Sequence, residues 1–161
     1  SQIAIPYDNV DKEFLIQPKK WDTKGLGTFM NVMGPISSII DILAFLAFWF
    51  ILGYNGTSHE TYFQTAWFVE CLISETLIIH FVRTSKIPFI QSRAHPILTS
   101  LTLVTILGTI ITPLLLHKIS AFHFEILPPL YYLIVVCLTV LYIILVQIVK
   151  KIYIKKVGEW L

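Results

Sequence analysis

The sequence predicts an all-α integral membrane protein, a bundle of four transmembrane helices that follows a polar N-terminal arm. Of its 161 residues, 55% are hydrophobic and 14% are charged, and the mean hydropathy is +0.73. A soluble domain of this length would need far more charge on its surface. Four apolar runs are long enough to cross a bilayer, which takes about 20 residues at roughly 1.5 Å each. We therefore expect a cytoplasmic arm at residues 1–28 and a membrane domain at residues 29–161.

The arm is polar and is interrupted by prolines and glycines. These residues favour turns and extended pieces, and they leave room for one short helix between Asp11 and Gln17. The lysines of the arm are few and have acids beside them, which argues against a nucleic-acid site. Its start lacks the basic segment and apolar core of a signal peptide. Because the first residue is Ser1 rather than Met, we expect the chain to be part of a longer protein.

The first predicted span, residues 29–53, carries a small polar patch. Ser37 and Ser38 precede Asp41 by four and three residues, so a helix would place the three side chains on one face. Lipid would leave these groups without hydrogen-bond partners, so we expect the patch to face the inside of the bundle. Two roles remain open: hydrogen bonding between helices, or a contribution of Asp41 to a cation site.

The second predicted span, residues 64–82, carries two acids and a histidine. At 100° per residue, Glu70 and Glu75 fall within one arc of about 140°, and His80 lies on the other side. Ionisable residues within a span are costly, so they usually face a protein interior, a partner or an ion path. Either the acids are neutral or bonded to neighbouring helices, or they handle a cation or a proton. We interpret His80 as a hydrogen-bonding residue between helices rather than a metal or haem ligand.

The third predicted span, residues 96–116, begins at a proline, contains no ionisable side chain and is expected to serve packing. The fourth, residues 128–149, carries tyrosines that suit the membrane interface. In the loop between them, His117 and His123 lack a third ligand for a metal site.

Charge sets the expected orientation. Eleven of the twelve lysines and arginines fall in the arm, in the connection between the second and third spans, or in the C-terminal tail, and the exception is Lys118. By the positive-inside rule, the basic side is cytoplasmic. We predict a multi-pass protein of the cell inner (plasma) membrane with both termini in the cytoplasm. Basic segments beside the membrane also favour contact with anionic lipid.

The sequence contains no phosphate-binding loop, aspartyl-phosphorylation motif, cofactor fingerprint or nucleophile elbow. Its residues therefore indicate no catalytic site and no bound cofactor. One remaining class of function is part of a transporter, with Glu75, Glu70 and Asp41 as candidate metal ligands. The other is a free-standing four-helix membrane subunit for interaction or assembly, whose buried acids pair helices. A haem-bearing oxidoreductase would need histidines that face each other across helices, and His80 is the one histidine within a span.

Several segments resemble the C-terminal membrane region of bacterial magnesium-translocating P-type ATPases. They are AIPYDNVDKEF, KKWDTKGLGTFMNVMGPISSIID, FQTAWFVECLISETLIIHFVRTSKIPFIQSRA and the terminal IKKVGEWL, and the run HFVRTSKIPFIQSR is the most specific. Ten helices cross the membrane in that family. The resemblance implies that this chain holds the cytoplasmic loop after the sixth helix, followed by helices seven to ten. The topology predicted from charge agrees with that placement.

The resemblance implies a parent that couples ATP hydrolysis, through a phosphorylated aspartate, to movement of Mg²⁺ into the cytosol. The catalytic domains and most ion ligands would lie upstream, so Mg²⁺ and ATP belong to the parent. Its remaining helices and cytoplasmic domains are the expected partners, together with the lipid bilayer. At Glu75 the family usually carries glutamine. Because the eighth helix contributes to a cation site in other P-type ATPases, Glu75 is a candidate cation ligand or proton carrier.

Overall fold

The computed structural model describes residues 6–9, 11, 23–119 and 121–158. Within this part of the chain, four helices are long and apolar enough to cross a membrane, which confirms the predicted fold class. They are α2 (Thr23–Leu46), α3 (Glu60–Val82), α4 (Pro96–Leu116) and α5 (Pro129–Val157). A π-helical turn, η2 (Ala47–Ile51), continues α2, and a 3₁₀ turn, η3 (Thr57–His59), leads into α3. The short helix expected after Asp11 lies outside the described residues.

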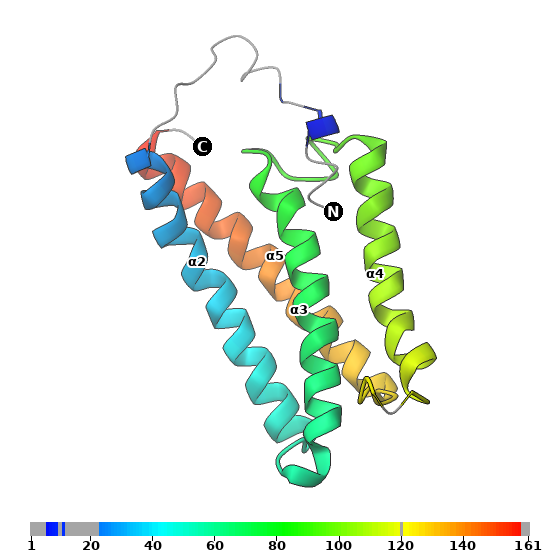
Figure 1. Cartoon of the computed structure of the whole chain (residues 1–161). Helices are drawn as coiled ribbons and strands as arrows, with labels where there is room; N and C mark the ends of the chain where they lie inside the picture. The colour runs from blue at the N-terminus through cyan, green and yellow to red at the C-terminus, as the bar shows by residue number, and fades with distance from the viewer. Residues whose placement is uncertain (1–5, 10, 12–22, 120, 159–161) are drawn as a thin grey trace.

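The helices are arranged around α3 (Figure 1). α2 packs most extensively on α5, α3 crosses α5 and approaches α2 near the α2–α3 connection, and α4 packs on α3. The start of α2, the α3–α4 loop and the end of α5 lie at one end of the bundle, while the α2–α3 and α4–α5 connections lie at the other. We call the first of these the basic end, because Arg83, Arg93, Lys150 and Lys155 belong to it.

Proline and glycine mark several helix ends. α4 begins at Pro96, and the Nδ1 atom of His95 accepts a hydrogen bond from the Ile97 N–H at 3.3 Å, which caps the first turn. α5 ends before Gly158, whose φ of 91° lies in the left-handed region that glycine adopts without strain. α5 reaches Val157 rather than ending near residue 149, so all four lysines of the expected tail are helical.

Helix α2 starts earlier than predicted, and this changes the position of Pro35. The helix begins at Thr23 rather than at residue 29, so the proline lies in its interior and not in its first turns. A proline there removes the N–H that would bond the Asn31 carbonyl. The helix nevertheless continues, and Met33 and Ile36 on either side of the proline are buried in the bundle. Tertiary packing therefore holds the helix through a position that local propensity disfavours.

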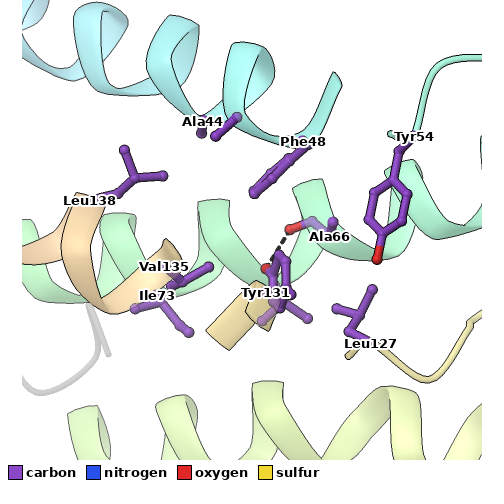
Figure 2. Packing of buried hydrophobic residues seen from close by; sticks show 11 residues of the cluster. Ala44, Phe48, Tyr54, Ala66, Ile73, Leu127, Tyr131, Val135 and Leu138 are labelled. Carbon is purple, nitrogen blue, oxygen red and sulfur yellow. Dashed lines mark hydrogen bonds between the residues drawn. The ribbon is translucent and has the colours of Figure 1, made fainter. Parts of the chain in front are cut away.

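Two clusters of buried apolar side chains hold α2, α3 and α5 together. One, shown in Figure 2, includes Phe48, Ala66, Val69 and Tyr131 and lies toward the end opposite the basic end. The second lies nearer the basic end and is formed by Phe29, Met33, Ile36, Ile40, Phe81, Tyr142, Val146 and Tyr153. In contrast, α4 exposes long apolar side chains such as Leu103, Val104 and Leu115. Such a face suits lipid or further membrane helices.

Tyr131 adds a buried hydrogen bond to the first cluster. Its ring is fully buried, and its hydroxyl donates a hydrogen bond of 2.7 Å to the Ala66 carbonyl on α3 (Figure 2). We expect Tyr131→Phe to lower the free energy of unfolding by about 1 kcal/mol, because the ring stays and one buried bond is lost. Chemical denaturation of the full-length protein in mixed micelles would measure it. Tyr132→Phe, at a half-buried position next along α5, is the control. Equal losses for the two variants would contradict the role of this bond.

Candidate functional site

A cavity of about 280 Å³, lined by both polar and apolar side chains, lies between α2, α3 and α5. α2 contributes Ser37 and Asp41, which are one helical turn apart and therefore face the same way. α3 contributes a stripe at helical spacing, and α5 contributes Tyr142. We call it the acid cavity, and its lining residues are Ser37, Ile40, Asp41, Cys71, Ser74, Glu75, Ile78 and Tyr142. The cavity has room for several waters, each of which occupies about 30 Å³ in the liquid.

The two predicted glutamates of α3 have different environments. Glu75 lines the acid cavity and is exposed, whereas Glu70 is 3% exposed and is not among the lining residues. The Oε2 atom of Glu70 has no hydrogen-bond partner among the described residues. Buried polar atoms are rarely left in this state, so this oxygen has room for a partner that the described residues do not supply. The prediction that both acids lie within one arc of the helix did not reveal that one is buried and the other exposed.

Asp41 completes the acidic group. It is half-buried on the α2 side of the cavity, and both Asp41 and Glu75 lie close enough to Glu70 to repel its charge. The three candidate residues thus share one region of the bundle. Because like charges repel, a bound proton or a cation would lower the cost of their proximity.

Hydroxyl groups supply the remaining polarity of the cavity. Ser37 Oγ and Tyr142 Oη are 2.7 Å apart and hydrogen-bonded, which joins α2 to α5 beside Asp41. The Ser38 side chain is different, because it is exposed and donates to the carbonyl of Gly34 on its own helix at 3.4 Å. The expectation that Ser38 faces the inside of the bundle is therefore wrong. Its own helix satisfies the hydroxyl, so no interhelical partner is needed.

The chemistry available to the acid cavity is that of oxygen ligands with water. Carboxylates, hydroxyls and retained waters are the ligands that Mg²⁺ prefers. Among the described residues, however, no three histidine, cysteine or acidic side chains come together in an arrangement that would hold a metal directly. The role of Glu75, Glu70 and Asp41 as metal ligands stays a prediction.

His80 has the structural role that was predicted for it. It is 1% exposed, and its Nε2 atom lies 2.8 Å from Thr102 Oγ1, which ties α3 to α4. Its ring also packs against Phe89, with the ring centroids 4.9 Å apart.

A second polar network lies at the basic end, and sequence reasoning did not find it. The arm residue Asp8 forms an ion pair with Arg83, and its other carboxylate oxygen accepts the His95 N–H at 2.9 Å. Arg83 also donates to the Asn9 carbonyl at 2.8 Å and to Ser92 Oγ at 3.1 Å. Two residues of the arm are therefore bound to the loop between α3 and α4.

Asp11 makes the second attachment of the arm. Its carboxylate accepts hydrogen bonds from Thr84 Oγ1 at 2.6 Å and from Ser92 Oγ at 2.8 Å. Burial by itself raises the pKa of Asp11, but these two hydrogen bonds and the charges of Lys86 and Arg83 outweigh it. The pKa is consequently below its ordinary value of 3.8. The stabilisation that the carboxylate supplies is complete above pH 3.8 and is lost only as the pH falls through the lowered pKa.

The signal for this network was present in the sequence but was dispersed. Asp8 and Asp11 lie in the segment AIPYDNVDKEF, and all their side-chain partners lie in HFVRTSKIPFIQSR, more than 70 residues away. Both segments carry the resemblance to a known family. The two segments meet only in the tertiary structure, so neither segment by itself predicts the contact between them.

Comparisons with known proteins identify the same family along nearly the whole chain. Residues 1–152 match the family described as the C-terminus of cation-transporting ATPases. The chain is 42% identical to the "Magnesium-transporting ATPase, P-type 1" of Salmonella typhimurium (strain LT2) and 41% identical to the protein of that name from Escherichia coli (strain K12). These alignments cover 99% and 98% of this chain but 18% of each relative. The chain therefore spans less than a fifth of the length of these curated relatives.

Proposed function

Because this chain belongs to the family formed by the C-terminal region of cation-transporting ATPases, we propose that it is the membrane bundle of a P-type ATPase that moves Mg²⁺ into the cytosol at the expense of ATP. The observation that carries the proposal is 42% identity along the chain to a magnesium-transporting ATPase. In the family's terms, α2 to α5 are helices seven to ten. ATP and the phosphorylated aspartate belong to the remainder of the parent, and Mg²⁺ is its cargo.

The bundle supports the transport helices of the parent. Two apolar clusters join α2, α3 and α5, and the arm is attached to the α3–α4 loop at Asp8 and Asp11. These features suit a scaffold against which other helices move. The exposed apolar faces of α2 and α4 then contact those helices or lipid. The basic end faces the cytoplasm of the cell and meets anionic lipid headgroups.

The acid cavity adds an acid to the ion path. Glu75 is the candidate, because it is exposed at the cavity while Glu70 is buried. A Mg²⁺ ion that keeps part of its water shell needs an oxygen-lined, hydrated space of this kind. Asp41 lines the same cavity from α2, and Glu70 lies close to both of these acids. In the alternative interpretation, a free-standing interaction subunit, the same acids only join helices.

Transport by the full-length protein tests the main proposal. Reconstituted in vesicles, it is expected to take up Mg²⁺ when ATP is supplied and to form an acid-stable phosphoenzyme. If thermal unfolding shows that the preparation is folded and it neither takes up Mg²⁺ nor forms the phosphoenzyme, the free-standing subunit is favoured.

Glu75→Gln tests the role of the acid cavity. We expect the KM for Mg²⁺ in the ATPase reaction to rise about tenfold, which corresponds to about 1.4 kcal/mol. Complete loss is not expected, since the resemblance places glutamine at this position in related pumps. Glu60→Gln is the control, because Glu60 is exposed on the same helix and away from the cavity. An unchanged KM for Glu75→Gln would remove Glu75 from the ion path.

Glu70→Gln separates an ion-path role from helix pairing. Lower thermal stability with an unchanged KM would assign Glu70 to helix pairing. A higher KM with unchanged stability would assign it to the ion path.

A further inference from the structure

Lys150 differs from every other lysine that the structure describes at the basic end. Its side chain is 1% exposed, although Lys151, Lys155 and Lys156 on the same helix are exposed. A lysine near a helix end ordinarily extends its ammonium to water. Lys150 instead directs it inward, where an unsatisfied charge would be costly.

The ammonium of Lys150 is bound by the carboxyl-terminal end of α3 and by the start of the α3–α4 loop. Its Nζ atom donates to the carbonyls of Phe81 at 2.7 Å, Thr84 at 2.9 Å and Lys86 at 3.4 Å. An ammonium has three donors, so the three carbonyls satisfy it. Carbonyls at the end of a helix lack intrahelical partners, and the helix dipole makes this end negative. α5 thus supplies the cation that caps α3.

Thr84 connects this cap to the arm. It is fully buried, its carbonyl accepts from Lys150, and its hydroxyl donates to Asp11 at 2.6 Å. The same hydroxyl accepts the Lys86 N–H at 3.1 Å, so the turn after α3 is fixed on both sides. A residue of α5, the loop and a residue of the arm therefore form one continuous set of hydrogen bonds.

We propose that Lys150 is a positioning residue: its ammonium, held by three carbonyls, fixes the α3–α4 loop in the shape that binds the arm at Asp8 and Asp11. This links the attachment of the arm at Asp11 to helix α5 through Thr84. The inference rests on contacts within this chain, so it stands or fails separately from magnesium transport.

Hydrogen–deuterium exchange on the full-length protein tests the proposal. Lys150→Met keeps the length of the side chain and removes the ammonium. We expect amides of the arm around Asp8 and of the loop around His95 to exchange about tenfold faster, while amides in the middle of α2 keep their wild-type rates. Lys151→Met, at the next position on the helix, is expected to match the wild type. Wild-type exchange in the loop of Lys150→Met, or equal acceleration along all four helices, would overturn the proposal.

Chemical rescue separates the ammonium from the packing of the lysine stem. Lys150→Ala leaves a space that n-propylammonium matches in length and charge. Added n-propylammonium is expected to restore slow exchange in the loop, whereas 1-propanol is expected not to restore it. Equal effects of the two additives would contradict a role for the charge.

Thr84→Val tests the connection even if the Lys150 variants fail to fold. It removes the hydroxyl bound to Asp11 and keeps the carbonyl bound to Lys150. Exchange is expected to rise in the arm but not at the end of α3. An arm as protected as in the wild type would show that the proposed connection is wrong.

Discussion

Replacing Arg83 with methionine is expected to lower the free energy of unfolding by about 2–3 kcal/mol, and to release the arm. The side chains of the Arg83–Asp8 pair are 9% and 12% exposed, so neither charge is well solvated. Removing one partner of such a pair leaves the other charge poorly satisfied, which costs more than the pair itself contributes. Arg83→Met also removes donors to Ser92 and to the Asn9 carbonyl.

Denaturant titration of the full-length protein in mixed micelles would measure this loss, and limited proteolysis would report on the arm. Arg93→Met is the matched control, because Arg93 is exposed in the same loop. A double-mutant cycle with Asp8→Asn isolates the coupling of the two side chains. Additive effects of the two substitutions would contradict a direct pair.

Phe48→Ala is expected to destabilise the bundle by about 3 kcal/mol. The ring is fully buried in the cluster of Figure 2 and packs against Tyr131, with the centroids 5.4 Å apart, and against Phe63 at 6.2 Å. In a membrane the loss comes chiefly from packing contacts, because lipid is as apolar as the protein interior. The cavity would lie where η2 and α3 meet α5.

Phe50→Ala is the control for this substitution. Phe50 lies two residues further along η2 and is 73% exposed, so its truncation removes few contacts within the bundle. We expect a loss below about 0.5 kcal/mol, in line with exposed positions generally. Thermal unfolding of the two variants in the same detergent makes the comparison. Similar losses would mean that the cluster around Phe48 does not carry the stability of the bundle.

The candidate site could be predicted in part. Helical spacing placed Glu70 and Glu75 within one arc of α3 and Asp41 toward the inside of the bundle, but it could not tell which acid is buried. Glu70 and Glu75 lie within one arc of α3, and their exposures differ because of how α2 and α5 cross that arc. The angle and position at which helices cross depend on how they pack, so the sequence of α3 by itself does not reveal them.

Lys150 shows the same limit more sharply. By the positive-inside rule it counts with the other lysines of the basic end toward the predicted orientation. Its side chain is nevertheless buried on the carbonyls of α3. The rule concerns the side of the membrane on which a charge lies, whereas the partner depends on a helix that is more than 60 residues away.

The sequence by itself determined that this is a four-helix membrane protein, because hydropathy and length act within each segment and need no partner. Its motifs also indicated the family, which the comparisons then established. Tertiary structure alone decided that Glu75 lines a cavity while Glu70 is buried, that Asp8 and Asp11 bind the α3–α4 loop, and that Lys150 caps α3. Each of these contacts joins segments far apart in the chain. These contacts stabilise the bundle only after the helices have packed, because packing brings the partner atoms within contact distance.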